Sequence, residues 1–251
     1  MSYAFDLGRK VAIVTGANTG IGQGIALALA QAGASVVAVG RSSMDETREL
    51  IAPTKVPFRA VAADLSSLEP IEKILDAAED LGRVDILVNN AGIIRRADAI
   101  DFTEQDWDDV MSLNLKTTFF FCQAAARRML KDGQGGKIIN IASLLSFQGG
   151  IRVPSYTASK SGVAGLTKLL ANEWAAKGIN VNAIAPGYIV TNNTEALRQD
   201  EKRSAEILSR IPAGRWGRAE DIGGAAVFLS SQAANYIHGT VLPVDGGWLA
   251  R

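Results

Sequence analysis

Apolar residues follow two alternating patterns along this chain. Short runs of five or six mostly consecutive apolar residues, rich in valine and isoleucine, are typical of strands that are buried on both faces of a sheet. In the segments between these runs, apolar residues recur every three or four positions, as they do on one face of a helix. The first pattern predicts seven strands, at Lys10–Thr15, Ser35–Gly40, Phe58–Ala63, Val84–Val88, Lys137–Ala142, Ile179–Ala185 and Gly239–Val244.

The second pattern predicts helices between most of these strands, at Ile21–Ala32, Leu68–Leu81, Glu104–Leu130, Ser155–Ala176 and Glu220–Leu229. Between the second and third strands the sequence is polar and contains proline, and no helix is assigned there. Alternation of buried strands and helices indicates a parallel sheet with helices on both faces, the doubly wound Rossmann-type α/β fold. No linker, repeat or low-complexity tract interrupts the pattern, so we predict one domain over residues 1–251 with a seven-stranded parallel sheet.

A charged segment at about 191–215 lies between the sixth strand and the last helix, and it forms no further strand–helix unit. We interpret this segment as two short helices that form a mobile cover, or lid, over a substrate site. A solvated surface excursion is the alternative interpretation.

Charge and cysteine content exclude several classes of function. The 251 residues contain 26 Lys and Arg and 26 Asp and Glu, so no overall charge attracts the chain to nucleic acid or to an anionic membrane. Cys122 is the single cysteine, which excludes an internal disulfide and metal sites built on several thiolates. The first ten residues lack a secretory pattern, and no apolar run is long enough to span a bilayer. We therefore expect a cytoplasmic protein that binds small molecules, with neither nucleic acid nor membrane as a partner.

A glycine-rich loop joins the first strand to the first helix, with the sequence Thr15-Gly-Ala-Asn-Thr-Gly-Ile-Gly22. Backbone N–H groups and the helix dipole at such a position bind the pyrophosphate of a dinucleotide. Glycines allow the tight turn, the close approach of the phosphates and the packing of helix against sheet. An isolated glycine cluster can also be only a turn. The predicted cofactor contacts are Gly16, Asn18, Thr19, Gly20, Ile21 and Gly22.

The residues after the second strand bear on the choice of dinucleotide. Arg41 stands where a carboxylate would bind the ribose diol of NAD, and a guanidinium can instead pair with the 2′-phosphate of NADP. Alternatively, Arg41 stacks on adenine or faces solvent. Asp64, at the end of the third strand, is placed to accept a hydrogen bond from the adenine amino group, or to cap a helix.

Tyr156 and Lys160 are four residues apart near the start of a predicted helix, so their side chains share one face. An ammonium near a phenol stabilises the phenolate and makes tyrosine a usable acid or base near neutral pH. Such pairs are also common in helices without any catalytic role. Ser143 follows the fifth strand, at the sheet edge where open α/β folds bind ligands, and can hold a substrate oxygen beside the tyrosine. The amide of Asn114 is expected to hold a water linked to Lys160, or to lie at the surface.

Taken together, these motifs resemble those of the short-chain dehydrogenase/reductase family over nearly the whole chain. Ser143, Tyr156 and Lys160 fall where the family has its triad, and Asn114 completes its tetrad. The resemblance implies hydride transfer between a nicotinamide and a carbinol carbon, with Tyr156 exchanging the oxygen proton, Lys160 also binding the nicotinamide ribose and no metal. It also implies a homotetramer with contacts through the long helices. Further cofactor contacts implied by the family are Leu65, Asn90, Ala91, Gly92, Pro186, Gly187, Ile189 and Thr191.

Within the family, several strings resemble those of enzymes acting on keto-deoxy sugar acids: Ile93-Ile-Arg-Arg96, Ser146-Phe-Gln-Gly-Gly-Ile-Arg-Val-Pro154, Asn192-Asn-Thr194 and Asp245-Gly-Gly-Trp-Leu-Ala-Arg251. Such a substrate carries one carboxylate and several hydroxyls, so the pocket that binds it needs guanidinium, amide and hydroxyl side chains. The candidates are Arg96, Arg152, Gln148, Asn193 and Ser143, and for either arginine a surface ion pair is the alternative. The resemblance favours NAD(H), whereas Arg41 favours NADP(H).

Two other functions fit the same sequence. A dehydrogenase of gluconate, or of another polyol or ketone, shares the chemistry and differs only in pocket residues. A non-catalytic protein that senses the dinucleotide keeps the fold without turnover, but the intact Ser143, Tyr156 and Lys160 argue against it. His238, the single histidine, lies at a strand entrance, where we expect a structural role.

Overall fold

The computed structural model describes residues 4–131 and 133–251, so residues 1–3 and 132 of the predicted domain lie outside it. Its centre is a seven-stranded sheet of order β3-β2-β1-β4-β5-β6-β7, in which every neighbouring pair is parallel. This confirms the predicted Rossmann-type fold. The strands are β1 (Val11–Thr15), β2 (Ser35–Gly40), β3 (Phe58–Ala62), β4 (Ile86–Asn89), β5 (Gly136–Ile141), β6 (Ile179–Pro186) and β7 (Val241–Val244).

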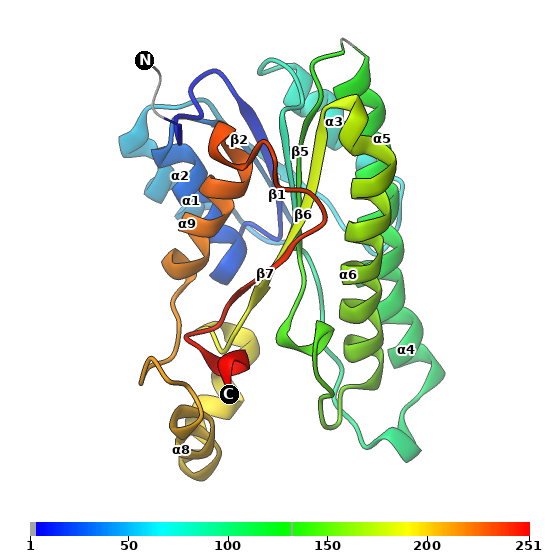
Figure 1. The fold of residues 1–251 in the computed structure, drawn as a ribbon, viewed down its shortest axis with the longest axis vertical. Coiled ribbons are helices and arrows are strands. Elements are labelled where there is room, and N and C mark those ends of the chain that lie inside the picture. The colour runs from blue at the N-terminus through cyan, green and yellow to red at the C-terminus, as the bar shows by residue number, and fades with distance from the viewer. Residues whose placement is uncertain (1–3, 132) are drawn as a thin grey trace.

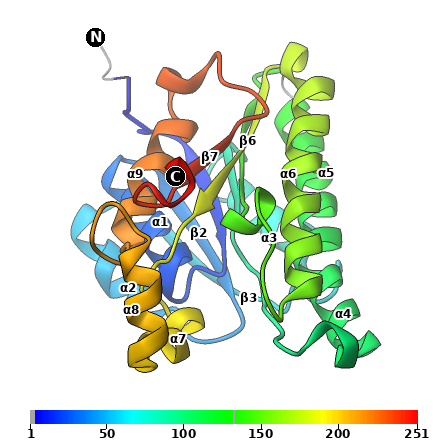
Figure 2. The same cartoon turned by 60° about the horizontal axis from the view of Figure 1, so that its bottom comes forward.

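Helices cover both faces of the sheet, as Figure 1 shows. On one side lie α1 (Gly20–Gln31), α2 (Asp45–Ile51) and α9 (Ala219–Ser230). On the other lie α3 (Ile71–Glu79), α4 (Glu104–Met111), α5 (Thr118–Leu130) and α6 (Pro154–Trp174). Two short helices, α7 (Glu195–Gln199) and α8 (Glu201–Ser209), lie beyond one end of the sheet and come forward in Figure 2.

The side chains of β1 show why its sequence is continuously apolar. Val11 and Ile13 belong to the hydrophobic cluster under α3, α5 and α6, whereas Ala12 and Val14 belong to the cluster under α1 and α9. Successive residues of a strand point to opposite faces, so a strand covered on both sides needs apolar residues at every position.

Three parts of the structure differ from the expected elements. α2 was not expected; it starts with Asp45 and Glu46, which favour a helix N-terminus, and its buried Thr47 donates to the Ala17 carbonyl at 2.8 Å. The helix expected over Leu68–Leu81 starts only at Ile71, after Pro70. The helix expected over Glu104–Leu130 is interrupted by a π-helical turn at Ser112–Thr117, which contains Asn114. Insertions of this kind frequently occur at functional sites.

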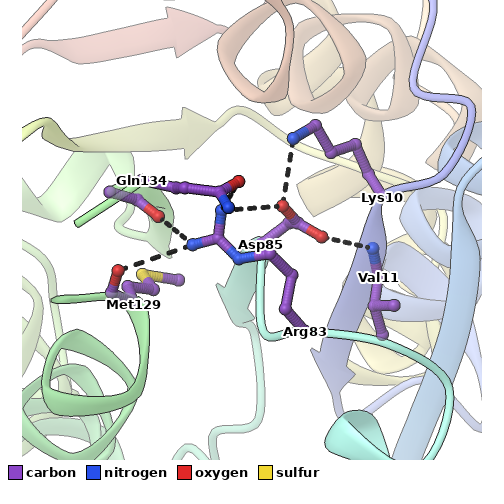
Figure 3. Close-up of polar contacts among 7 residues, drawn as sticks. Lys10, Val11, Arg83, Asp85, Met129 and Gln134 are labelled. Atoms are coloured by element: carbon purple, nitrogen blue, oxygen red, sulfur yellow. Dashed lines mark hydrogen bonds and ion pairs between the residues drawn. The ribbon is translucent and has the colours of Figure 1, made fainter. Parts of the chain in front are cut away.

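An ion cluster joins the strands at their amino-terminal ends (Figure 3). The buried carboxylate of Asp85 accepts hydrogen bonds from the Lys10 ammonium and the Val11 backbone N–H, both at 3.0 Å. The guanidinium of Arg83 lies 3.5 Å from the same carboxylate and also donates to the Gln134 side chain at 3.1 Å. One buried carboxylate thus ties the start of β1 to the segment that precedes β5.

We expect Asp85→Ala to lower the free energy of unfolding by about 1–3 kcal/mol, because the Val11 N–H and two cations lose their buried acceptor. Urea denaturation followed by circular dichroism measures the change. The control is Asp80→Ala, which removes an exposed ion pair with Arg59 and is expected to cost less than about 1 kcal/mol. Equal losses in the two variants would show that the Asp85 cluster does not stabilise the sheet.

Candidate active site

Three cavities adjoin one another beyond the carboxyl ends of the strands. One of about 240 Å³ lies beside Arg41 and Asp64, and a second of about 230 Å³ follows the glycine loop to Tyr156 and Lys160. A third of about 310 Å³ opens from Tyr156 toward α8. The first two share Gly16, Asn18, Ala91 and Gly92 as walls, and the last two share Tyr156 and Asn193. The three cavities therefore form one trough, which runs from the end of β2 to the end of β6.

A larger cavity, of about 380 Å³, lies at the opposite end of the sheet, near the Asp85 cluster and His238. Open α/β sheets bind ligands outside the carboxyl ends of their strands, so position, rather than size, favours the trough as the active site. His238 contacts Asn180 through its Nε2 atom at 3.2 Å, far from the predicted catalytic residues along the sheet.

The glycine loop has the backbone geometry that its sequence predicts. Gly16 and Gly20 adopt φ values of +63° and +58°, a region that favours glycine. A Cβ at Gly22 would lie 2.2 Å from the Gly16 carbonyl oxygen, so the start of α1 packs tightly under the loop. The Asn90 amide donates to the carbonyls of Thr15 and Gly16, at 2.9 and 3.2 Å. The loop is therefore held in place from β4.

Thr15 begins the predicted glycine loop and supports the site, although it was not among the predicted cofactor contacts. Its hydroxyl accepts hydrogen bonds from the backbone N–H groups of Asn90 and Ala91, both at 2.9 Å. These bonds join the end of β1 to the segment after β4, and the residues next to both form walls of the second cavity. The sequence signal was its position as the last, polar residue of an otherwise apolar strand.

Arg41 and Asp64 lie in the same cavity, as their positions after β2 and β3 predict. Hydrogen bonds from Ser66 lower the pKa of the Asp64 carboxyl, and the charge of Arg41 acts in the same direction. Asp64 accepts from the Ser66 backbone N–H at 2.9 Å, a contact within the turn before α3, whose N-terminal cap is Pro70, so Asp64 does not cap that helix. Leu65 lines the same cavity.

Most of the other predicted cofactor residues form walls of the trough. Thr19, Gly20, Ile21, Asn90 and Thr191 line the second cavity, while Pro186 and Gly187 line the third. Two lie elsewhere: Gly22 is buried beneath the loop, and Ile189 is buried and lines a separate cavity beside Ile211.

Tyr156 and Lys160 project from the first turns of α6 into the second cavity. The Lys160 ammonium lies 5.6 Å from the centroid of the Tyr156 ring and donates to the Ile141 carbonyl at 2.6 Å. This bond attaches the helix to the end of β5. Burial lowers the pKa of Lys160 to about 8. A buried ammonium of this kind still donates strong hydrogen bonds at neutral pH.

Several groups act on the pKa of Tyr156. Burial raises the pKa of the Tyr156 phenol, whereas the Ser143 hydroxyl and the charge of Arg96 lower it. A lowering of this pKa by Lys160 is the expectation from the sequence and stays a prediction. The Lys160 ammonium, 5.6 Å from the centroid of the Tyr156 ring, donates to the Ile141 carbonyl, and the charge of Arg96 also acts on the phenol.

Asn114 is buried in the π-helical turn and contacts different partners from those predicted. Its side-chain carbonyl accepts from the Ile93 N–H, and its amide donates to the Ile93 carbonyl, both at 2.9 Å. The second amide hydrogen is directed to the Ser159 hydroxyl at 3.4 Å. Both amide hydrogens are thus used within the protein, so the expected amide-bound water next to Lys160 is not supported. Asn114 instead positions the backbone beside Gly92.

The third cavity contains most of the predicted substrate residues. Ser143, Arg96, Gln148 and Asn193 line it together with Tyr156. Arg96 also donates to the Asn193 carbonyl at 3.2 Å, so it reaches the start of the 191–215 segment.

Arg152 does not line this cavity. It forms an ion pair with Asp98, its Nε 3.0 Å from the carboxylate, and is exposed, which is the surface pairing considered as its alternative. Its neighbours Ile151 and Val153 line the cavity, whereas Arg152, with a backbone φ of +64°, does not.

Several residues from distant parts of the sequence complete the cavity. Trp248 and Tyr188 pack against each other, with ring centroids 4.7 Å apart, and Trp248 donates to the Gln148 side chain at 3.3 Å. Arg203 and Arg210 reach the cavity from α8 and its C-terminal cap. Trp248 lies in the Asp245–Arg251 string that the sequence analysis singled out, but no local motif marks Tyr188, Arg203 or Arg210 as cavity residues.

The comparisons with known proteins identify the family. A family model described as enoyl-(acyl carrier protein) reductase matches residues 16–249. The 2-dehydro-3-deoxy-D-gluconate 5-dehydrogenase of Escherichia coli K12 is 60% identical over 99% of this chain and 98% of its own length. This chain is a short-chain dehydrogenase/reductase. The Bacillus subtilis enzyme of the same name is 58% identical to this dehydrogenase over 99% of the chain and 98% of its own length.

Solved structures agree with this assignment. A protein of Agrobacterium tumefaciens, assigned as a 2-deoxy-D-gluconate 3-dehydrogenase and solved with bound NADP, superposes with a TM-score of 0.95 at 63% identity, covering all of both chains. A gluconate 5-dehydrogenase of Burkholderia cenocepacia, solved with NADP and tartrate, has a TM-score of 0.92 at 38% identity, covering 99% of this chain and 98% of the other. The protein is an NAD(P)-dependent dehydrogenase that acts on a CH–OH group. Within the described ranges, none of its helices has the length and apolar character needed to traverse a bilayer.

Replacing Arg96 by Gln is expected to shift the pH dependence of alcohol oxidation to higher pH. The positive charge of Arg96 lowers the pKa of Tyr156, so its removal raises that pKa, and the phenolate that accepts a proton then forms only at higher pH. The profile of kcat/KM against pH measures the shift. Arg95→Gln is the matched control, because Arg95 pairs with Asp106 and Asp109 and does not line the cavity. An unchanged profile in Arg96→Gln, or an equal shift in both variants, would contradict the role of Arg96.

Proposed function

We propose that this dehydrogenase interconverts a secondary alcohol and a ketone of a keto-deoxy sugar acid, with the specificity of the enzymes named 2-dehydro-3-deoxy-D-gluconate 5-dehydrogenase. The observation that carries the proposal is 58–60% identity over nearly the whole chain to three enzymes of that name. The third cavity, called the substrate cavity from here on, supports this proposal. Its walls include three arginines, Arg96, Arg203 and Arg210, and no aspartate or glutamate among the described residues, so it attracts an organic acid.

The proposed mechanism follows from the side chains at the junction of the second and third cavities. Tyr156 takes the hydroxyl proton during oxidation and returns it during reduction. Ser143, whose hydroxyl lies beside the phenol, orients the substrate oxygen. Lys160 holds the start of α6 against β5 and presents its remaining N–H groups to the cofactor cavity. When bound, the nicotinamide supplies or accepts the hydride.

We propose that the second cavity holds the cofactor. Its walls include the glycine loop, Asn90 and Thr191. Gly16 and Gly20 line this cavity with φ values that favour glycine, and the cavity lies at the N-terminus of α1, where backbone N–H groups can bind a pyrophosphate. Gly92 and Ala91 continue the wall toward Tyr156.

A gluconate 5-dehydrogenase is the second candidate. The enzyme of that name from Gluconobacter oxydans is 43% identical over 97% of this chain, and the Burkholderia structure contains the acid tartrate. Both candidates need a cationic cavity. Oxidation of reduced cofactor, followed by absorbance, with the oxidised keto-deoxy sugar acid and with 5-ketogluconate distinguishes them through kcat/KM.

Tyr156→Phe tests the assignment of the reaction to this site. The variant is expected to bind cofactor normally and to lose at least about a thousandfold in kcat, because the ring remains while the transferable proton is removed. Fluorescence of the bound reduced cofactor measures binding, and the absorbance assay measures turnover. Tyr236→Phe is the control, since Tyr236 is fully exposed and lies outside the trough. Substantial turnover by Tyr156→Phe would remove Tyr156 from the mechanism.

We further propose that the enzyme uses NADP(H) as well as NAD(H). Arg41 and Ser42 line the cavity at the end of β2, and no carboxylate follows β2 directly to bind the ribose diol. The Asn18 amide donates to the Ser42 hydroxyl at 2.8 Å, which fixes the loop that carries Arg41. NADP is bound in three related structures.

Arg41→Asp is expected to shift cofactor preference toward NAD by at least about tenfold, because a carboxylate repels the 2′-phosphate and can bind the diol. The ratio of kcat/KM values for the two cofactors measures the shift. Arg48→Asp serves as the control, as Arg48 lies over the Phe58 ring outside this cavity. Unchanged NADP affinity in Arg41→Asp would show that Arg41 does not touch the 2′-phosphate.

We also propose that the 191–215 segment is a lid, that the enzyme is a homotetramer and that it is cytoplasmic. The segment at about 191–215 does contain two short helices and borders the substrate cavity, which supports its role as a lid. A homotetramer is supported by large apolar side chains exposed on the long helices, Trp107, Phe120 and Leu169. Balanced charge and the small-molecule trough support a cytoplasmic enzyme.

A further inference from the structure

Two arginines, one on α8 and one at its C-terminal cap, line the substrate cavity together. Arg203 and Arg210 are seven residues apart, or two helical turns, so they lie on the same side of the helix. Ile207 lies between them on this side and is buried in a cluster with Leu144 and Trp248. Because Ile207 fixes which side of α8 faces the protein, it also directs both arginines to the cavity wall.

Arg210 is stacked on an aromatic ring and has no carboxylate partner among the described residues. Its guanidinium carbon lies 4.0 Å from the centre of the Trp248 ring. Stacking uses the face of the guanidinium and leaves the N–H groups along its edge available for a bidentate bond to a carboxylate. Trp248 is itself held by Tyr188 and Gln148, so the position of Arg210 is defined before any ligand binds.

Arg203 supplies a second cation at the same wall. Its Nη1 pairs with Glu206 at 3.1 Å, an exposed contact one turn along the helix. Exposed pairs of this type are weak, so an organic acid in the cavity competes with Glu206 for Arg203.

We propose that Arg210, assisted by Arg203, binds the carboxylate of the sugar acid and that this clamp determines the preference for acids. The inference rests on the proposed function. In an acid oxidised at carbon 5, the carboxylate carbon is four bonds from the reacting carbon, roughly 5 Å by standard bond lengths. The cation that binds it must therefore stand away from Tyr156, across the cavity.

Arg96 is less suited to this role. One of its N–H groups is already used by the Asn193 carbonyl, and Asn193, like Tyr156, lines both the second and the third cavity, so Arg96 lies at the reacting end. The clamp on α8 also gives the 191–215 segment a direct contact with the substrate. A bound acid then holds α8 over the cavity, whereas an uncharged analogue does not.

The test compares Arg203→Gln, Arg210→Gln and the double variant with the wild type. The substrates are 2-dehydro-3-deoxy-D-gluconate and its methyl ester, which has nearly the same shape without the charge. For the acid, KM is expected to rise about 10- to 100-fold in the double variant, because hydrogen bonds to a charged group are lost. The value of kcat is expected to change by less than about threefold, since the reacting carbon remains at Tyr156. The preference for the acid over the ester should largely disappear.

Lys202→Gln is the matched control, because it removes the same charge from the same helix at a residue that does not line the cavity. An increase in KM that is equal for acid and ester, or equal in Lys202→Gln, would overturn the clamp. Arg203→Gln leaves the Arg210–Trp248 stack intact, so it tests the clamp even if Arg210→Gln disturbs folding. If the wild type oxidises the acid and the variants keep its KM, only the clamp is wrong. If the wild type oxidises the ester or other alcohols but no sugar acid, the proposed function and the clamp both fail.

Discussion

The site depends on a constraint of the sheet: all its strands are parallel and both its faces are covered by helices. In such a sheet every loop that follows a strand emerges at the same end. The glycine loop after β1, the segment after β4 and Ser143 after β5 meet there although they are far apart in the sequence. Helical packing on both faces leaves this end as the place where a cofactor and a substrate can lie side by side.

At this end, buried polar groups are held by specific bonds to strand ends and loops. Lys160 bonds to the last residue of β5, Asn90 bonds to the end of β1 and Asn114 bonds to the Ile93 backbone. Each bond compensates for the cost of removing a polar group from water, and each also fixes a wall of the trough. The same interactions that stabilise the interior therefore position the reacting groups before a ligand binds.

Charge is distributed unevenly along the trough. Near the cofactor end, Asp64 and Arg41 carry opposite charges, while the substrate cavity has arginines and no carboxylate among the residues described. At the reacting centre, burial disfavours the phenolate of Tyr156, and Arg96 offsets part of this effect. An anionic substrate adds a negative charge to this region, so a second set of cations on α8 allows the acid to bind without raising the pKa of Tyr156 further.

The sequence by itself determined the single-domain fold class and predicted most of the residues that line the trough, because these depend on local patterns. Runs of buried strand residues, the glycine loop and the spacing of Tyr156 and Lys160 each lie within one short segment. The π-helical turn around Asn114, the bonds of its amide and the effect of Arg96 on Tyr156 were decided only by the tertiary structure. So were the position of Arg152 outside the cavity and the meeting of Trp248 with Arg210. Each of these depends on which distant side chains become neighbours after the chain folds, and a hydrogen bond or a charge effect exists only at that close range.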